Sequence, residues 1–223
     1  MNEAIDIRIF DDIESLAQEA ASAVVEAYQG AIVKHGTFQW VLAGGGTPKR
    51  CYELLRDAPI NWSDVEVYFG DERCLPRGDS ERNDTMAAEA LFSHVDIPDE
   101  NIHCIAAELG ARAAADAYDL LLSNKRAPDL VLLGMGEDGH TASLFPGHHC
   151  PDDRLAIAVF EAPKPPPERV SMSFKAINRA AKKIIMSAGV GKREAFDRIK
   201  QGEKLPAGNI ETPIWFVDSA LLN

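Results

Sequence analysis

Short apolar runs alternate with helix-like stretches along most of this chain, and this alternation restricts its fold more than any other feature. The runs are continuously apolar, which is typical of strands that are covered on both faces. Helices between such strands favour parallel pairing within one sheet. The predicted strands are residues 38–43, 65–69, 130–133, 183–187 and 214–217.

Helices are predicted between these strands. Asp11 and Asp12 precede apolar residues at spacings of three and four, which predicts a helix that begins there and ends near Gly30. Further helices are predicted over residues 83–92, 109–122 and 192–200. Together these patterns predict a single α/β domain over residues 1–223, with an open, mainly parallel, Rossmann-like sheet flanked by helices on both faces.

The charge balance bears on the partners of the chain. Its 223 residues include 23 Lys plus Arg against 35 Asp plus Glu, a net charge of −12. Non-specific binding to nucleic acid depends on cations that displace counterions from the phosphates, so this acidic chain is not expected to bind nucleic acid. The hydrophobic share of 46% fits a folded chain with a sizeable core.

Neither a membrane span nor a secretory signal is visible in the sequence. No apolar stretch approaches the ~20 residues that cross a bilayer, and the first residues lack a basic region followed by an apolar one. The four cysteines, Cys51, Cys74, Cys104 and Cys150, form no CxxC pair. These observations predict a cytoplasmic protein with free thiols and no membrane partner.

Chemically unusual residues follow three of the predicted strands, at the edge where open α/β sheets bind their ligands. The first strand end reads AGGGTPKR, with Gly44, Gly45 and Gly46 followed by Thr47. Three glycines let the backbone turn tightly and direct N–H groups at an anion, and the amino end of the helix that follows favours negative charge. A glycine turn with packing duties only is an equal alternative, and neither GxGxxG nor a P-loop is present.

The second strand end reads YFGDER over residues 68–73. Arg73 is placed to hold a phosphate through a charge-assisted fork. Asp71 is a candidate base, or a partner that only orients this arginine. Read alone, the segment is more typical of a solvated loop with a local Asp–Arg pair.

The third strand end, residues 133–147, reads LGMGEDGHTASLFPG. His140 follows a Gly-rich turn and is the best candidate for a general base, because an imidazole pKa near ~6.5 suits proton transfer at neutral pH. Asp138 is placed to orient the ring or the attacking water. His148, His149 and Cys150 lack the spacing of a zinc site, so no metal is expected.

Two further sequence observations bear on the chemistry. GxSxG is absent, so a serine hydrolase is not favoured. The sequence GVGKR at residues 189–193 follows another apolar run and puts Lys192 at a predicted helix start. Lys192 is there a candidate second phosphate cation, although a lysine in such a segment is more often simply solvated.

Taken together, these segments resemble a known family. AGGGTP, FGDER, ERNDTMAAEALF, GMGEDGHTASLFPG, APKPPPER and AGVGKREAF, in this order and spacing, are similar to the 6-phosphogluconolactonases, which share one α/β fold with glucosamine-6-phosphate deaminases. Deaminases typically have Asp-Glu-Tyr where this chain has Asp71, Glu72 and Arg73, and Ile-Ala-Phe-Asn where TASLF follows His140. Both differences favour the lactonases.

The resemblance implies a role for each candidate residue. His140 would be the catalytic base, with Asp138 beside it. The phosphate or the rest of the substrate would contact Gly44, Gly45, Gly46, Thr47, Arg73, Arg169 and Lys192. Two departures from the family pattern put contacts in doubt: Ala43 and Gly46 replace serines of the phosphate turn, and Arg82 precedes Asn83 where the family has Ser-Asn.

The resulting hypothesis is hydrolysis of 6-phosphogluconolactone to 6-phosphogluconate, a step of the oxidative pentose phosphate pathway, without metal or organic cofactor. Backbone N–H groups of residues 136–140 are expected to stabilise the oxyanion. The chain is expected to be a monomer or a small homo-oligomer. Two alternatives remain: deamination or isomerisation of a sugar phosphate with Asp71 as the base, and a sugar-phosphate-binding relative without catalysis.

Overall fold

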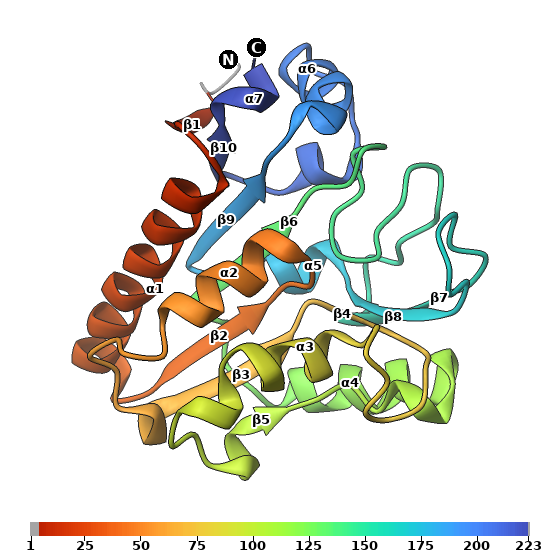
Figure 1. Cartoon of the computed structure of the whole chain (residues 1–223). Coiled ribbons are helices and arrows are strands. Elements are labelled where there is room, and N and C mark those ends of the chain that lie inside the picture. The colour runs from red at the N-terminus through yellow and green to blue at the C-terminus, as the bar shows by residue number, and fades with distance from the viewer. Residues whose placement is uncertain (1–4, 223) are drawn as a thin grey trace.

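The computed structural model of the chain describes residues 5–222 (Figure 1). Its strands are β1 (Asp6–Phe10), β2 (Phe38–Leu42), β3 (Val65–Phe69), β4 (Asp71–Arg73), β5 (Ile102–His103), β6 (Leu130–Gly134), β7 (Ala156–Val159), β8 (Arg169–Met172), β9 (Lys182–Ser187) and β10 (Ile214–Asp218). Its α-helices are α1 (Ile13–His35), α2 (Gly46–Leu54), α3 (Asn83–Ala90), α4 (Ala111–Ser123), α5 (Phe174–Asn178), α6 (Arg193–Lys200) and α7 (Ser219–Leu222).

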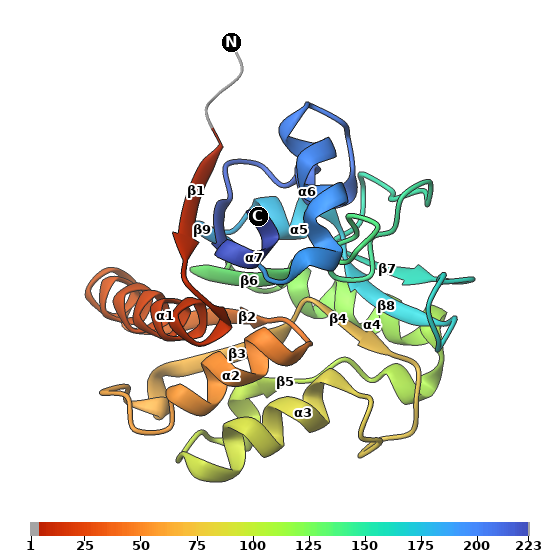
Figure 2. The same cartoon turned by 45° about the horizontal axis from the view of Figure 1, so that its top comes forward.

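The larger sheet has seven strands in the order β1-β10-β9-β6-β2-β3-β5, and every strand pair in it is parallel. Helices α1, α2 and α3 lie on one face, and α4, α5 and α6 lie on the other (Figure 2). The predicted α/β class, with a mainly parallel sheet between helices, is therefore confirmed. All five predicted strands are present, because each is buried on both faces and its apolar run is read directly from the sequence.

The predicted end of the first helix was wrong. Asp12 caps α1 as expected, with its side chain accepting a hydrogen bond from the Ser15 N–H at 2.8 Å. The helix then continues through Gly30 to His35, and Gly36 ends it in the left-handed conformation, with φ of 75°. Gly30 does not stop the helix because the next residue, Ala31, is buried in the core and tertiary packing outweighs the weak helix propensity of one glycine.

A smaller antiparallel sheet, in the order β4-β8-β7, was not predicted. Residues 71–73 were interpreted as more typical of a solvated loop, but they form β4 and pair with β8. Asp71 lies opposite Ser171, and Arg73 lies opposite Arg169. A three-residue strand carries no readable periodicity, so only the pairing with a distant segment reveals it. The edge strands β1 and β5 were also missed.

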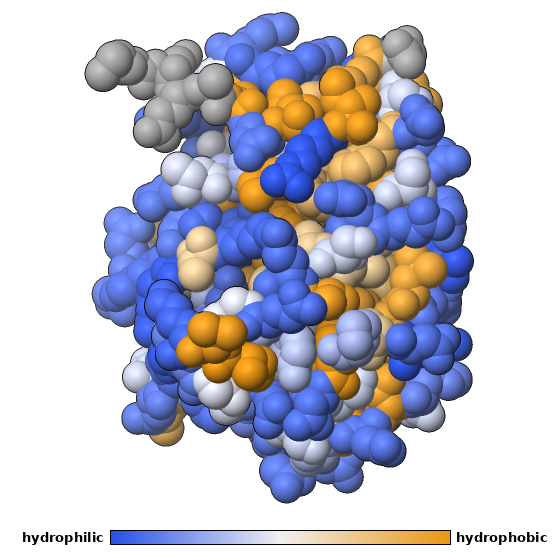
Figure 3. Space-filling view, turned by 90° about the vertical axis from the view of Figure 1, so that its left-hand side faces the viewer, coloured by the Kyte–Doolittle hydropathy of each residue, from blue (hydrophilic) through white to orange (hydrophobic). Residues whose placement is uncertain are grey.

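The surface of the α1 and β1 side is mainly hydrophilic, with apolar side chains gathered near its top and in a smaller group lower down (Figure 3). Exposed apolar side chains of these two elements are Ile9, Ile13 and Val33. All four cysteines are free. Among the helices within residues 5–222, none is long and apolar enough to cross a membrane.

Candidate active site

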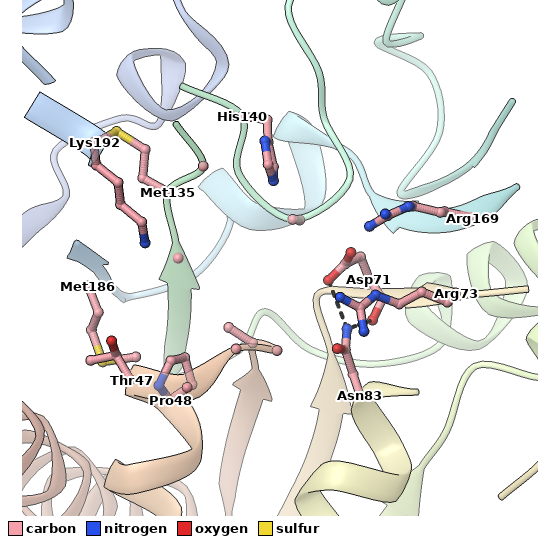
Figure 4. Close-up of a pocket in the computed structure, with 17 residues that line it drawn as sticks. Thr47, Pro48, Asp71, Arg73, Asn83, Met135, His140, Arg169, Met186 and Lys192 are labelled. Atoms are coloured by element: carbon pink, nitrogen blue, oxygen red, sulfur yellow. Dashed lines mark hydrogen bonds between the residues drawn. The ribbon is translucent and has the colours of Figure 1, made fainter. Parts of the chain in front are cut away.

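The site lies where the chain leaves the middle of the sheet in opposite directions. Neighbouring strands β2 and β6 are parallel, and β2 leads to α2 on one face of the sheet whereas β6 leads toward elements on the other. Such a switch point leaves a crevice outside the carboxyl ends of the strands. A cavity of about 230 Å³ opens there (Figure 4). Its lining includes Gly44, Gly45, Gly46, Thr47, Arg73, His140, Arg169 and Lys192, which is every predicted site residue except Asp138.

The glycine turn forms one wall of this cavity. Gly45 is the N-cap of α2 with φ of 107°, and no side chain caps the helix. The first N–H groups of a helix lack intrahelical acceptors, so they are available to an anion here. Ala43 and Gly46 offer no hydroxyl, which leaves the Thr47 hydroxyl and the backbone N–H groups as the polar groups of the turn.

His140 is held by its own loop. Asp138 accepts hydrogen bonds from the His140 backbone N–H at 3.1 Å and from imidazole Nδ1 at 2.5 Å. With Nδ1 bonded to a carboxylate, the neutral imidazole carries its proton there, and Nε2 is left with the lone pair that a base needs. Gly136 makes room for the ring, because a Cβ at that position would lie 2.1 Å from two of its atoms.

Burial and hydrogen bonding act on Asp138 in opposite directions. Burial raises the pKa of the Asp138 carboxyl, but the hydrogen bonds from His140 outweigh it, so the pKa lies below its ordinary value. Asp138 is therefore a carboxylate at neutral pH. It does not line the cavity itself, which fits a residue that orients the imidazole rather than one that touches a ligand.

The predicted oxyanion donors are mostly unavailable. The Gly136 N–H donates to the His140 carbonyl, the Gly139 N–H donates to the Gly136 carbonyl, and the His140 N–H donates to Asp138. These bonds build the turn that presents the imidazole. The expectation that residues 136–140 stabilise an oxyanion through their amides was therefore wrong for these three N–H groups.

Two arginines enter the cavity from the smaller sheet. Arg73 and Arg169 are direct partners across β4 and β8, which places two guanidinium groups together. Arg73 donates to the Glu81 carbonyl through Nη1, while its Nε is buried without a hydrogen-bond partner among the described residues. Arg169 donates to the carbonyls of Lys164, Pro165 and Pro166. Burial and the charge of Arg73 lower the pKa of Arg169, although Asp71 opposes this shift. The pair therefore gains from a bound anion.

Lys192 comes from the opposite side of the cavity. It precedes α6 as its N-cap, as the sequence predicted, and its ammonium points into the space between Thr47 and His140 in Figure 4. Burial lowers the pKa of this ammonium. It has no ion pair within the part of the chain that the structure describes. Cations thus face the cavity from both sides.

Several lining residues were not predicted as ligand contacts. Met135, just after β6, and Met186, near the end of β9, supply apolar surface, and Ala142 lies two residues after His140 in the same loop. Asn83 also lines the cavity and donates to the Asp71 carbonyl and carboxylate. The preceding Arg82, which departs from the family pattern, points away and is fully buried. It bonds to Asp84, Glu108 and backbone carbonyls, so the departure leaves Asn83 at the cavity.

The histidine and cysteine cluster after the loop lies apart from this cavity. His148, His149 and Cys150 line a separate cavity of about 420 Å³ on the far side of Phe145. Phe145 packs against the His140 ring, with centroids 4.7 Å apart. Within residues 5–222, no group of three or more His, Cys, Asp or Glu side chains could hold a metal ion.

Comparison with known proteins agrees with this geometry. The model of a family described as glucosamine-6-phosphate isomerases/6-phosphogluconolactonase matches residues 11–218. The 6-phosphogluconolactonase of Mycobacterium tuberculosis is 38% identical over 207 residues, covering 85% of this chain and 83% of that protein. The crystal structure of 6-phosphogluconolactonase from Thermotoga maritima superposes with a TM-score of 0.90 at 27% identity, over 97% of this chain and 100% of that one.

A monomeric glucosamine-6-phosphate deaminase has the same fold, with a TM-score of 0.85 at 18% identity over 98% of this chain and 99% of that one. The fold and the crevice therefore define an α/β protein of the class that these lactonases and deaminases share. The chain belongs to the glucosamine-6-phosphate isomerase/6-phosphogluconolactonase family, and the resemblance found in its sequence is confirmed.

Proposed function

We propose that this protein hydrolyses 6-phosphogluconolactone to 6-phosphogluconate, with His140 as general base. The observation that carries the proposal is one cavity in which an imidazole stands between cations that are at least partly buried, with its Nε2 free of hydrogen bonds to any described residue. The name shared by its similar relatives supports the same reaction. Removing a proton from water needs the imidazole, and holding a phosphorylated substrate needs the cations.

The phosphate is assigned to Arg73, Lys192 and the amides of residues 44–47. These groups reach the cavity from different elements, so together they fix both the position and the orientation of the substrate. Binding the remote phosphate places the lactone carbonyl beside His140 and removes translational freedom before the reaction. Arg169, next to Arg73, is assigned to the substrate beyond the phosphate.

The reaction then follows from the loop geometry. His140 Nε2 takes a proton from water as the water oxygen attacks the lactone carbonyl carbon, giving a tetrahedral oxyanion. Asp138 stabilises the imidazolium that forms. The carbon–oxygen bond of the ring then breaks, and protonated His140 returns its proton to the departing ring oxygen. The water is consumed and the free carboxylic acid ionises, so the reaction is balanced.

The deaminase alternative needs Asp71 as a base. Ser143 donates to Asp71 Oδ2 at 2.6 Å, and Asn83 donates to Oδ1 at 3.1 Å. Both carboxylate oxygens are thus engaged, which disfavours proton abstraction by Asp71. A binding protein without catalysis would need neither Asp138 nor the arrangement that leaves His140 Nε2 unengaged.

The test compares the wild-type protein with His140→Gln on freshly prepared 6-phosphogluconolactone, with chelator present and the spontaneous rate subtracted. We expect the wild type to accelerate hydrolysis and the substitution to lower kcat by about 10²- to 10⁴-fold, because general-base catalysis contributes this much. KM should change little, since the phosphate groups remain.

Two outcomes would contradict parts of this proposal. If the His140→Gln variant accelerated hydrolysis as much as the wild type, the substrate assignment would stand but His140 would not be the general base. No acceleration by the wild type, together with ammonia release from glucosamine 6-phosphate, would replace the lactonase by the deaminase.

A further inference from the structure

A buried carboxylate joins the two halves of the cavity. Asp71 is 7% exposed and stands at the start of β4, two residues before Arg73. Its Oδ2 accepts a hydrogen bond from Ser143 Oγ at 2.6 Å, and its Oδ1 accepts one from Asn83 Nδ2 at 3.1 Å. Ser143 belongs to the loop that carries His140, whereas Asn83 begins α3. One side chain therefore connects the loop of the base to the strand of a phosphate cation.

Asn83 extends this connection to the glycine turn. Its side chain also donates to the Asp71 carbonyl at 2.8 Å, so the backbone and the carboxylate of Asp71 both fix the Asn83 amide (Figure 4). The amide lies so close to Gly44 that a Cβ there would meet its Oδ1 at 2.0 Å. Asn83 is 3% exposed, so this contact is closed to bulk water. The turn that offers N–H groups to the phosphate thus rests on a side chain fixed by Asp71.

The backbone before Ser143 is bent to make this connection. Ala142 has φ of 47°, in the left-handed region that non-glycine residues rarely adopt, and it lines the cavity. Ser143 is 1% exposed, and its N–H donates to Ser171 Oγ at 3.2 Å. Ser171 is the partner of Asp71 across β4 and β8. A strained residue persists only where its surroundings fix it, and here they fix the Ser143 hydroxyl on Asp71.

We propose that Ser143 and Asp71 are positioning residues that set the distance between His140 and the bound phosphate. The proposal rests on the proposed function, because it assumes that His140 attacks a substrate whose phosphate is held by Arg73 and the glycine turn. A misplacement of about 1 Å between reacting groups can cost about 10²-fold in rate. Removing the Ser143 hydroxyl disconnects the loop that carries His140 from β4 and the glycine turn. No group that is assigned to the phosphate is removed.

The experiment compares Ser143→Ala with Ser143→Thr, which keeps the hydroxyl. We expect Ser143→Ala to lower kcat by about 10- to 100-fold, while the inhibition constant of inorganic phosphate stays within about twofold of the wild-type value. Ser143→Thr is expected to restore most of kcat. Ser187→Ala is the matched control, because Ser187 is equally buried and its hydroxyl has no hydrogen-bond partner among the described residues.

A double-mutant cycle with Asp71→Ala separates positioning from a general loss of stability. Asp71→Ala and Ser143→Ala should lower kcat together no further than Asp71→Ala alone, since both break the same connection. Multiplicative effects would overturn the proposal, as would a Ser143→Ala variant with wild-type kcat or one whose phosphate inhibition weakens in step with kcat. Failure of the wild type to hydrolyse the lactone is a separate result: it removes the proposed function, and this inference with it.

Discussion

At the scale of single residues, the cavity holds cationic side chains in places where burial disfavours their charge. Lys192 is a cation that burial disfavours and that no described acidic side chain pairs with. Arg73 has a buried Nε without a hydrogen-bond partner in residues 5–222, and Arg169 lies opposite Arg73 on the neighbouring strand. Each arrangement costs free energy unless an anion is bound. The dianionic phosphate of the proposed substrate would relieve all of them, because it would supply the missing acceptors and opposite charge.

The depressed pKa of Lys192 leads to a prediction on pH. In the proposed function Lys192 holds the phosphate only when it is protonated, so the affinity for a phosphorylated ligand should be complete below the pKa of Lys192 and should be lost as the pH rises through it. Because burial lowers this pKa, the affinity for 6-phosphogluconate should begin to weaken below the pH at which an exposed lysine titrates, near ~10.4. Isothermal titration calorimetry from neutral to alkaline pH measures this affinity.

Lys192→Arg is the control for this effect. Arginine keeps its charge throughout the range, so the weakening should be absent or much smaller in the variant. An equal pH dependence in both proteins would show that another group is responsible.

At the scale of elements, α1 shows how packing sets a boundary that propensity does not. Gly30 is exposed inside the helix, five residues before its end at His35, and a Cβ there would meet nothing within 4 Å. Gly36 also has open space around it, but its φ of 75° is unfavourable for any residue with a side chain. A side chain is therefore tolerated at Gly30 and unfavourable at Gly36.

The two glycines predict opposite effects of the same substitution. Gly30→Ala should raise the free energy of unfolding by about 0.5–1 kcal/mol, because alanine loses less backbone entropy in a helix. Gly36→Ala should lower it by about 1 kcal/mol, since it forces a left-handed conformation on alanine. Denaturant titration of both variants measures the change, and a destabilised Gly30→Ala would show that α1 does not extend through residue 30 in solution.

At the scale of the whole molecule, one core connects both sheets. A single cluster of buried apolar residues includes Trp40 of β2, Trp215 of β10 and Val170 of β8. The site is built on this shared core, with His140 from the loop that follows β6 of the large sheet and Arg73 and Arg169 from the small sheet. The net charge of −12 repels an anionic substrate at long range, but salt screens that repulsion beyond ~8 Å, so the local cations dominate inside the cavity.

The shared core predicts one cooperative unfolding transition, as expected of the single domain proposed for residues 1–223. Calorimetry, far-UV circular dichroism and tryptophan fluorescence should give coincident midpoints, because one buried apolar cluster spans both sheets. The product 6-phosphogluconate should raise the midpoint, since it binds only the folded protein. Two resolved transitions would divide the chain into independent units.

The sequence by itself determined the five central strands of the large sheet, the start of α1 and the cavity residues that follow strand ends. These are local properties: a strand buried on both faces is continuously apolar, and in a parallel sheet the carboxyl ends of the strands share one edge. His140, Lys192 and the glycine turn could therefore be placed together without coordinates.

Only the tertiary structure decided the rest. The pairing of Arg73 with Arg169, the buried links from Ser143 and Asn83 to Asp71, and the passage of α1 through Gly30 all depend on contacts between distant segments. The engagement of the loop amides around His140 likewise depends on the shape of the folded turn. Hydrogen bonds and strand pairing are decided by distances in space, and a pattern of residue types along the chain does not contain those distances.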